Sequence, residues 1–213
     1  MPLIKLETLH PDCKWALWEI TEPFEKLSKE LDLKKEAEKV ENIKNDLKKR
    51  EKTAGRLLLK KIMESWGEVY EGTNCDSYGK PFLKNHNYFA SISHSNGYTV
   101  AIIDRNYKVG IDIELIKEKI VKIAPRVFSS EEMGSNRTSL AKLITLWSVK
   151  ESLYKLYGER GLNFRENIKI LPFNFEEAGG VCKGEVRTNG NSNMFTVKYF
   201  RYKNFMIAYI LNQ

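Results

Sequence analysis

The fold class predicted from the sequence is α+β, arranged in two halves that each combine short strands with one dominant helix. Helical periodicity occurs twice, within residues 25–61 and at Leu140–Tyr157, and segments with strand-like patterns lie on both sides of each. A tight polar connection, Asp104-Arg105-Asn106-Tyr107, separates the two groups of elements. We therefore expect domains at 1–104 and 105–213, a division that a chain of 213 residues is long enough to support.

The first half begins with a strand-like segment and continues into a basic helical segment. Strands are expected at Lys14–Ile20, Tyr88–Ser93 and Tyr98–Ile103, and the Asn96-Gly97 pair is a strong turn signal before the last of them. After the first strand, apolar residues at helical spacing favour one long amphipathic helix or two in series. These residues are Val40, Ile43, Leu47, Ala54, Leu58 and Ile62.

The second half begins with a strand at Val109–Ile113, where β-branched residues dominate. The segment Leu140–Tyr157 contains neither Gly nor Pro and repeats large apolar residues at helical spacing, so it predicts a long helix. Further strands are expected near Asn167–Leu171, Gly184–Arg187, Met194–Phe200 and Phe205–Leu211.

Positive charge is concentrated in the first half. The chain has a formal net charge of +7, and residues 25–61 hold thirteen Lys/Arg and eight Asp/Glu, a net +5. An electropositive helix would attract phosphates and an acidic protein partner by long-range steering. Two alternatives are a nucleic-acid-binding surface and a simple solvated face. No RRM, KH, zinc-finger or helix-turn-helix signature supports the first of these.

Two carboxylates in the expected strand of the second half are candidate metal ligands. Residues two apart in a strand point to the same face, so Asp112 and Glu114 face one way and Ile111 and Ile113 the other. Two like charges on one face repel unless a cation lies between them, and oxygen ligands favour Mg²⁺ or Mn²⁺. Gly110 is consistent with a close backbone approach. The alternative is an ordinary solvent-facing pair.

The long helix adds a third carboxylate and two lysines. Glu151 and Lys155 lie one turn apart, and Lys150 belongs to the same helix. A hard cation bound to three carboxylates with a lysine beside it is suited to a pyrophosphate. The alternative is a solvated Glu–Lys surface pair, worth only a few tenths of a kcal/mol.

The segment Ser91-Ile92-Ser93-His94-Ser95 is a candidate anion-binding corner. Hydroxyls, an imidazole and exposed N–H groups beside a turn can form a concave site for phosphate. Gly79-Lys80-Pro81 is expected to be a turn that displays a lysine. A nucleophilic serine is not indicated, because no G-x-S-x-G elbow occurs. The alternative for His94 is a structural role.

The cysteines and the apolar segments indicate where the protein works. Cys13, Cys75 and Cys182 are odd in number and scattered, so neither a disulfide framework nor a zinc site is expected from the sequence. No signal peptide is recognised at Met1–Lys5, and no apolar run reaches about 18 residues. We expect a soluble cytoplasmic protein without a membrane partner.

Taken in order, these motifs resemble a known family. A G-K-P turn, S-H-S, G-I-D-I-E and W-S-x-K-E-S-x-x-K form the ordered signature of the 4′-phosphopantetheinyl transferases, and the likeness is to the long monomeric type that includes the surfactin synthetase activator. It covers roughly residues 48–162, including Arg56 in an A-G-R-L-L segment and Glu132 in F-S-S-E-E. The resemblance implies two subdomains related by pseudo-twofold symmetry, each a small antiparallel sheet with one long helix, and an active site in the cleft between them.

The resemblance also implies a reaction. Asp112, Glu114 and Glu151 would ligate Mg²⁺, and Lys155 would neutralise the pyrophosphate of coenzyme A. Glu151, or a water on the metal, would take the proton of a carrier-protein serine. The phosphopantetheine arm would then move onto that acyl or peptidyl carrier protein, with release of 3′,5′-ADP.

Further residues are implied in binding the coenzyme. Lys80, Ser93 and His94 would contact its 3′-phosphate and nucleotide, assisted by Arg50 and Arg56, while Lys48, Lys49 and Lys52 could substitute. Glu132 matches a recurrent family acid of unassigned role. The carrier dock would include the apolar residues after the metal strand (Ile116, Ile120 and Ile123), unless these form core or a folded flap. A monomer that does not bind nucleic acid is expected.

Overall fold

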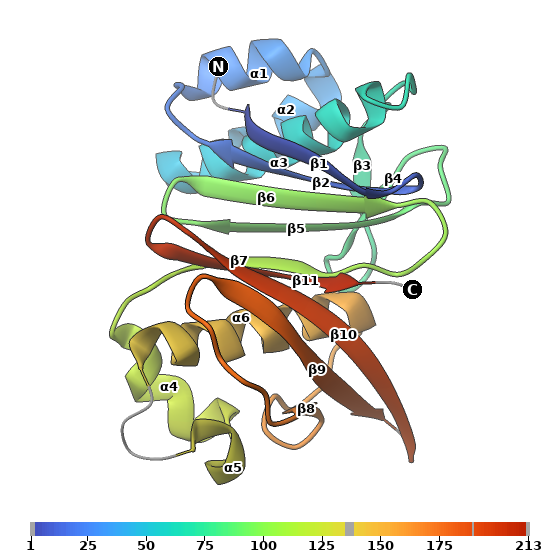
Figure 1. The fold of residues 1–213 in the computed structure, drawn as a ribbon. Helices are drawn as coiled ribbons and strands as arrows, with labels where there is room; N and C mark the ends of the chain where they lie inside the picture. Colours follow the sequence, from blue (N-terminus) through green and yellow to red (C-terminus); the bar gives the residue numbers. More distant parts are fainter. Residues whose placement is uncertain (1–2, 135–138, 189, 212–213) are drawn as a thin grey trace. The chain divides into compact units, whose positions relative to one another are not determined.

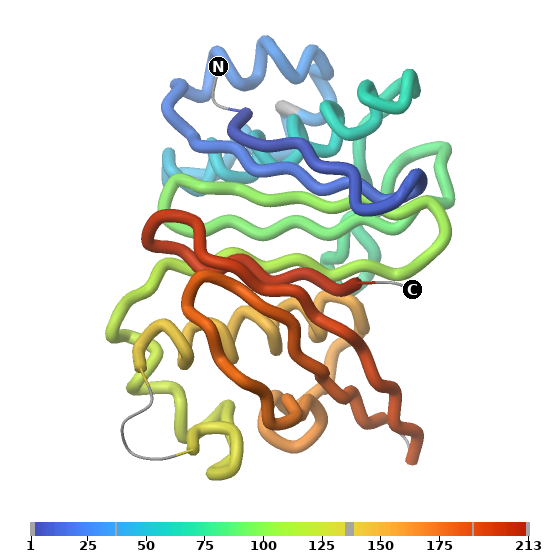
Figure 2. The backbone as a smooth tube through the Cα atoms, viewed as in Figure 1, coloured from blue at the N-terminus to red at the C-terminus, as the bar shows by residue number. Residues whose placement is uncertain are grey.

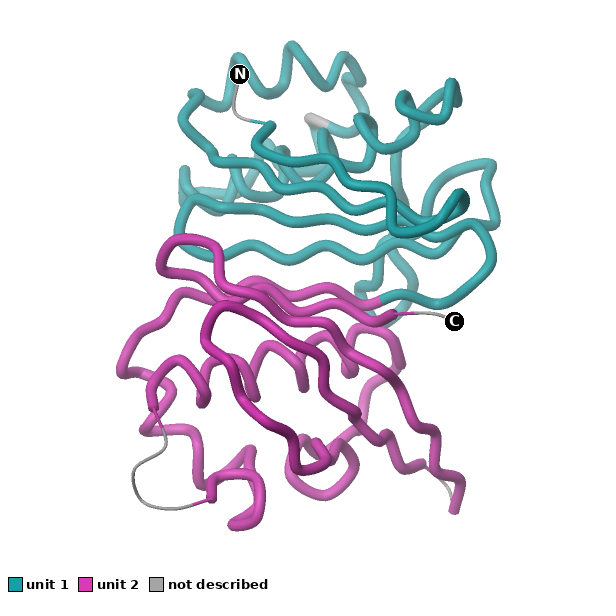
Figure 3. The backbone as a smooth tube through the Cα atoms, viewed as in Figure 1, with its two compact units in different colours: residues 1–109 teal, residues 110–213 magenta. Residues whose placement is uncertain are grey.

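A computed structural model describes residues 3–134, 139–188 and 190–211, and the chain divides into two compact units, residues 1–109 and 110–213 (Figure 3). Each unit is an antiparallel sheet packed against helices, so the α+β class is confirmed. The compact units divide after Val109 and not after Asp104. The connecting turn stays with the first unit, because the Arg105 N–H donates to the carbonyl of Asp12.

The first unit contains a six-stranded sheet in the order β1-β2-β6-β5-β4-β3 (Figure 1). The β5–β6 hairpin closes through Asn96 and Gly97, both at positive φ (48° and 83°), as expected from the Asn-Gly pair. The sequence did not predict β1, β3 or β4. The strands are β1 Leu3–His10, β2 Cys13–Glu19, β3 Thr73–Cys75, β4 Pro81–Leu83, β5 Phe89–Ser95 and β6 Tyr98–Asp104.

Three helices follow β2 in the first unit: the last two lie in series over the segment where the apolar spacing predicted one helix or two, and the first was not predicted. They are α1 Phe24–Leu31, α2 Lys34–Glu41 and α3 Asp46–Glu64. Asp32 ends α1 in the left-handed conformation, and the side chain of Asn45 caps α3 by accepting from the Lys48 N–H. Helix α3 packs on β2, β5 and β6, and buries Leu57, Leu58 and Ile62 in the core of this unit.

The second unit contains a five-stranded sheet in the order β7-β11-β10-β9-β8. Figure 2 follows the chain from β7 past α6 into the β9–β10–β11 meander, in which each strand pairs with the next. The predicted strands are all present, and β9 and β10 extend further than expected. The strands are β7 Ile111–Leu115, β8 Ile168–Ile170, β9 Gly179–Thr188, β10 Asn191–Tyr202 and β11 Phe205–Leu211.

The long helix α6, Leu140–Tyr157, has the bounds that the sequence predicted. The Ser139 side chain caps its start by accepting from the Lys142 N–H, and Gly158 ends it at φ 79°. Two shorter helices, α4 Lys119–Val127 and α5 Ser130–Met133, were not predicted. Helix α5 begins with a reciprocal capping box between Ser129 and Glu132.

A buried ion pair joins α6 to α5. The Lys150 ammonium is fully buried, lies 2.9 Å from Glu132 Oε2, and also donates to the carbonyls of Val127, Phe164 and Ile168. Glu132 in turn accepts from the backbone N–H of Ile170 at 2.8 Å. Burial lowers the pKa of Lys150, and the Glu132 carboxylate opposes that shift. Glu132, whose role the sequence left open, is therefore a structural anchor in this chain.

Gly110 lets the start of β7 approach α6 closely. A Cβ atom at this position would lie 1.9 Å from the carbonyl oxygen of Ser152, in the helix backbone. Because backbone cannot move aside as a side chain can, only glycine fits here. The close approach expected from the sequence is confirmed.

Removing the charge of Lys150 should destabilise the second unit strongly. We expect Lys150→Met to lower the free energy of unfolding by about 3–5 kcal/mol, because Glu132 and three carbonyls lose their donor in a buried site. Urea denaturation measures the change. Lys142→Met, on the same helix but partly exposed, is the control and should stay within about 0.5 kcal/mol. Equal effects of the two substitutions would contradict the role of Lys150.

Candidate active site

The two strand carboxylates lie on the face of the second sheet that α6 covers. Asp112 and Glu114 pair directly with Ala208 and Met206 of β11, both of which belong to the core under α6. They share a face, as predicted. That face is the helix-covered one, whereas Ile111 and Ile113 occupy the opposite face and are also fully buried.

Three residues of α6 are spaced to meet these carboxylates. Trp147, Glu151 and Lys155 occur at i, i+4 and i+8, which is one stripe of a helix. The Lys155 ammonium donates to Asp112 Oδ1 at 2.7 Å and to the Ile111 carbonyl at 3.2 Å. The Trp147 indole N–H donates to Glu114 Oε1 at 3.1 Å. The helix therefore holds both strand carboxylates, with Glu151 midway along the stripe.

Glu151 has a strongly shifted carboxyl group. Burial, together with the nearby negative charges of Asp112 and Glu114, raises its pKa to about 7, against the opposing effect of the Lys155 ammonium. Three carboxylates and one lysine thus share a half-buried site. Such a site stabilises a bound cation, because a cation would offset the mutual repulsion of the carboxylates.

The donor set suits a hard divalent cation, since all three side chains offer carboxylate oxygens. Within the described ranges, however, the oxygens of Asp112, Glu114 and Glu151 do not all lie within 4.8 Å of one another. Lys155 occupies one oxygen of Asp112 and Trp147 one of Glu114. The residues fit Mg²⁺ in chemistry and charge.

The serine-histidine motif of the first unit lies within a strand and not at a corner. Because β5 extends to Ser95, Ser93 and His94 point to opposite faces of the sheet. Ser93 is buried, on the face away from the helices, whereas His94 is exposed at the α3 side. The expected concave corner formed by both side chains was therefore wrong, because the turn begins only at Asn96.

A carboxylate that the sequence analysis missed holds His94. Glu51 of α3 lies 3.1 Å from His94 Nδ1 and accepts from the Gly97 N–H at 3.2 Å. Burial favours the neutral acid, but the hydrogen bonds from His94 and Gly97 prevail and hold the pKa of Glu51 below its usual value. The imidazole of His94 is thereby fixed in orientation, with its Nε2 atom directed away from Glu51.

Lys80 lies in a turn, as predicted, with Gly79 at φ 88°. The Asp76 side chain shapes this turn by accepting from the N–H groups of Tyr78 and Lys80. Burial and the nearby Lys108 lower the pKa of Lys80, and Asp76 opposes them. Two neighbouring lysines make this turn a favourable place for an anion.

The two candidate arginines are paired within the first unit. Arg50 donates to Asp46 one turn earlier at 2.8 Å. Arg56 donates to Glu36 of α2 at 3.0 Å and to the Lys52 carbonyl at 2.9 Å. Both arginines are therefore held by partners of their own, which the sequence analysis did not foresee.

Glu36 is the buried centre of a charged cluster. Its side chain is 1% exposed and meets Arg56, Lys39 and Lys84, and it also accepts from the Thr73 hydroxyl. Burial would raise its pKa, but the hydrogen bonds from Lys39 and Thr73 and the charge of Lys39 lower it overall. One carboxylate thus joins α2, α3 and the strand β3.

The isoleucines after β7 belong largely to the core. Ile120 is buried, while Ile116 and Ile123 are partly buried and pack against the core of the second unit. Val121, in contrast, is 54% exposed on the same helix, α4. The predicted alternative of core residues therefore describes this segment better than a free dock.

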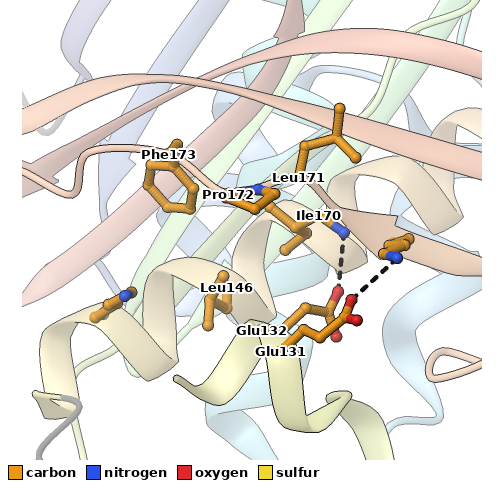
Figure 4. A pocket seen from close by; sticks show the side chains of 9 residues that line it. Glu131, Glu132, Leu146, Ile170, Leu171, Pro172 and Phe173 are labelled. Atoms are coloured by element: carbon orange, nitrogen blue, oxygen red, sulfur yellow. Dashed lines mark hydrogen bonds and ion pairs between the residues drawn. The ribbon is translucent and has the colours of Figure 1, made fainter. Parts of the chain in front are cut away.

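A pocket of about 420 Å³ opens beside Glu131 and Glu132 (Figure 4). Glu132 reaches from α5 to the backbone of Ile170, and Leu146 of α6 lies across from Phe173. None of the predicted catalytic or coenzyme-binding residues lines it. Its residues are Glu131, Glu132, Lys142, Leu146, Lys169, Ile170, Leu171, Pro172 and Phe173.

Comparison with known proteins connects this geometry to a family. Residues 108–209, which hold Asp112, Glu114, Glu151 and Lys155, match the 4′-phosphopantetheinyl transferase superfamily. The predicted family resemblance is confirmed over this range. The strand carboxylates and the α6 stripe thus lie in the part of the chain that is similar to phosphopantetheinyl transferases, and the nucleic-acid-binding alternative gains no support.

Individual relatives agree with this family match. The chain is 37% identical over 89 residues to a 4′-phosphopantetheinyl transferase of Aneurinibacillus migulanus, covering 39% of this chain and 37% of the relative. It is 35% identical over 92 residues to one of Bacillus pumilus (40% and 39%) and 35% identical over 88 residues to one of Bacillus subtilis (38% and 39%). The matched stretch thus spans less than two fifths of each relative.

The Glu36 cluster predicts an acid-sensitive first unit. Because the pKa of Glu36 is lower in the folded protein than its usual value, the stability it contributes is complete above the unfolded pKa. That contribution is lost as the pH falls through the folded pKa. We expect Glu36→Gln to lower the free energy of unfolding by about 3 kcal/mol at pH 7, with the difference from wild type shrinking below about pH 4.

Urea unfolding from pH 7 to pH 3 measures this difference. Glu38→Gln, an exposed position on the same helix, is the matched control and should give parallel curves. A Glu36→Gln deficit that stays constant over the whole pH range would contradict the assignment.

Proposed function

We propose that this protein is a Mg²⁺-dependent 4′-phosphopantetheinyl transferase that uses coenzyme A to modify a serine of an acyl or peptidyl carrier protein. The observation that carries the proposal is the carboxylate–lysine cluster of β7 and α6, which lies within the family match. The three relatives described above are all named 4′-phosphopantetheinyl transferases. The relatives are matched over part of their length, so the activity is a proposal for the whole chain.

Asp112, Glu114 and Glu151 would hold the Mg²⁺ ion. When bound, the ion would supply charge stabilisation to the pyrophosphate oxygens of coenzyme A. Trp147 would act as a positioning residue, because its indole N–H fixes Glu114. Phe164 stacks on both Trp147 and Tyr154, at ring-centroid distances of 5.2 and 5.1 Å, which fixes the indole in turn.

The side chains of α6 would carry the transfer. Glu151 would accept the proton of the carrier serine while the serine oxygen forms a bond to the β-phosphorus. The bond from that phosphorus to the bridging oxygen breaks, and 3′,5′-ADP leaves with negative charge on that oxygen. Lys155, already anchored on Asp112 and the Ile111 carbonyl, has a further N–H to offer to the departing phosphate. Little covalent work by the protein is required.

The first unit would supply contacts to the nucleotide part of coenzyme A. Lys80, with Lys108 nearby, would attract the 3′-phosphate, and His94 would offer its second ring nitrogen while Glu51 holds the first. Ser93, Arg50 and Arg56 remain candidates. For Arg56 to bind phosphate, it would exchange its bond with Glu36, which makes Arg56 less favourable than Lys80.

Helix α4 would be the side that binds the carrier protein. Val121 is exposed and lies between Lys119 and Lys122, which line a pocket of about 670 Å³ together with Leu140 and Leu143. Positive charges around an apolar centre suit an acidic carrier surface. This segment is proposed in place of Ile116, Ile120 and Ile123, for which the sequence left both a dock and a core role open and which pack in or against the core.

We place the reaction in the cytoplasm and expect a monomer that does not bind nucleic acid. The three cysteines are all free, which agrees with a reducing compartment. No helix in the described ranges is long and apolar enough to cross a membrane. Pairing of Arg50, Arg56 and Lys61 with carboxylates of the same unit leaves less free positive charge for a polyanion.

Intact-mass analysis of an apo carrier protein tests the reaction directly. Incubation with the protein, coenzyme A and Mg²⁺ should add one phosphopantetheine arm, and EDTA should prevent the addition. Glu151→Ala should slow the transfer at least about 10²-fold while leaving the fold intact. A Glu151→Ala rate within twofold of wild type at saturating Mg²⁺ and coenzyme A would rule out the proposed site.

The role of Trp147 has its own readout. Trp147→Phe keeps the ring stacked on Phe164 but removes the donor to Glu114, so the Mg²⁺ concentration for half-maximal rate should rise about tenfold. Excess Mg²⁺ should restore most of the rate. Tyr154→Phe, which keeps the other stacked ring, is the control and should leave the Mg²⁺ dependence unchanged. A change of rate without a change in Mg²⁺ requirement would argue against this positioning.

A further inference from the structure

Three potential metal ligands form a row across the first sheet. His10 of β1 pairs directly with Cys13 of β2, and Cys13 pairs directly with Asp104 of β6. Directly paired residues project their side chains to one face, with Cβ atoms roughly 5 Å apart. The register of β1 shifts between Thr8 and His10, and such an irregularity re-aims the side chain that follows it. An imidazole, a thiol and a carboxylate are thereby gathered at the end of three neighbouring strands.

The distances in this row suit a tetrahedral cation. One ligand atom from each of His10, Cys13 and Asp104 lies within 4.8 Å of the other two, and among the residues described no other trio of His, Cys, Asp or Glu meets this limit. His10 Nε2 is 3.1 Å from Asp104 Oδ2. Metal–ligand bonds of about 2.1 Å in a tetrahedron place two ligand atoms about 3.4 Å apart, which is close to the distance between His10 and Asp104.

The carboxylate of Asp104 is held in the orientation that such a site requires. Its Oδ1 atom accepts from the backbone N–H groups of Asn106 at 2.8 Å and Tyr107 at 2.9 Å. The other oxygen, Oδ2, is thereby directed to His10. Metal-binding carboxylates are commonly fixed in this way by hydrogen bonds to the oxygen that does not bind the metal.

Burial and charge also favour a cation at this point. Asp104 is fully buried and Cys13 is 2% exposed, whereas a third of the His10 side chain is exposed and gives a route from solvent. Burial and the adjacent Asp104 charge raise the pKa of the Cys13 thiol well above its usual value. A divalent cation would reverse this effect, because it stabilises the thiolate and the carboxylate together.

We propose that His10, Cys13 and Asp104 bind a Zn²⁺ ion. The donors are one nitrogen, one sulfur and one oxygen, a set that favours Zn²⁺ over the Mg²⁺ proposed for the second unit. His10 would bind through its ring nitrogen and Asp104 through its carboxylate, Cys13 would release its proton to solvent, and a water would complete the four ligands. The ion would tie the tip of the β1–β2 hairpin to the end of β6, and it is independent of the transferase activity.

The sequence did not predict this site. His10 and Cys13 are close along the chain, but Asp104 is ninety-four positions from His10, and no zinc spacing pattern includes it. Only the pairing of β2 with β6 brings the third ligand into place.

Titration with Co²⁺ and then Zn²⁺ tests the proposal on the full chain after chelation and removal of the chelator. Co²⁺ should bind in a one-to-one ratio, with the near-ultraviolet absorption of a thiolate–cobalt bond and the visible bands of a tetrahedral ion, and Zn²⁺ should displace it. Cys13→Ser should abolish the thiolate absorption. His10→Gln, at a partly exposed position that leaves the buried pair intact, should weaken binding at least about tenfold.

Cys75→Ser is the matched control, because Cys75 is the exposed cysteine of the same unit and the commonest source of adventitious binding. It should bind Co²⁺ as wild type does, and Zn²⁺ should raise its melting temperature but not that of His10→Gln. The proposal is overturned if wild type shows no thiolate–cobalt absorption, or if that absorption is lost in Cys75→Ser and kept in Cys13→Ser. If Cys13→Ser does not fold, the His10→Gln titration decides alone.

Discussion

The second unit depends on the buried bond between Lys150 and Glu132. Lys150 is in the middle of α6, and its ammonium meets groups from α4, α5, the segment before β8 and β8 itself. A buried charge is costly unless its hydrogen bonds are satisfied, and here the rotation and height of α6 are fixed by four acceptors at once. The positions of Trp147, Glu151 and Lys155 follow from that fixed rotation. The catalytic proposal therefore rests on an ion pair that touches no substrate.

The first unit uses buried carboxylates in a similar way. Glu36 gathers three cationic side chains between α2, α3 and β3, and Glu51 of α3 holds both His94 and the β5–β6 turn. In both units a buried charged side chain on the long helix, or packed against it, holds the neighbouring segments in place. Part of the positive charge that the composition shows, including Arg56 and Lys39, is consequently paired with carboxylates inside the unit.

The features that the sequence predicted depend on residues close together in the chain, whereas the contacts that it missed join residues far apart. The ends of α6, the shared face of Asp112 and Glu114, and the turns at Gly79 and Asn96-Gly97 depend on neighbours within a few residues, and these predictions were confirmed. The Glu36–Arg56 and Glu51–His94 pairs join residues twenty or more positions apart, so no local pattern reveals them. The serine-histidine corner was wrong because strand β5 continues through Ser95, which residue type alone did not indicate. The catalytic roles were assigned from sequence motifs, and they are proposals because a motif names residue types but does not show their chemistry.

The stripe formed by Trp147, Glu151 and Lys155 has a consequence for how this chain can vary. Each residue of an α-helix advances the side chain by about 100°, so one inserted or deleted residue between Trp147 and Lys155 would turn half of the stripe away from β7. Gly110 leaves no room for the helix to slide and compensate, because its backbone already touches that of Ser152. Related chains can therefore exchange side chains around this segment and lengthen the loops on either side of it. The number of residues from Trp147 to Lys155 must stay the same.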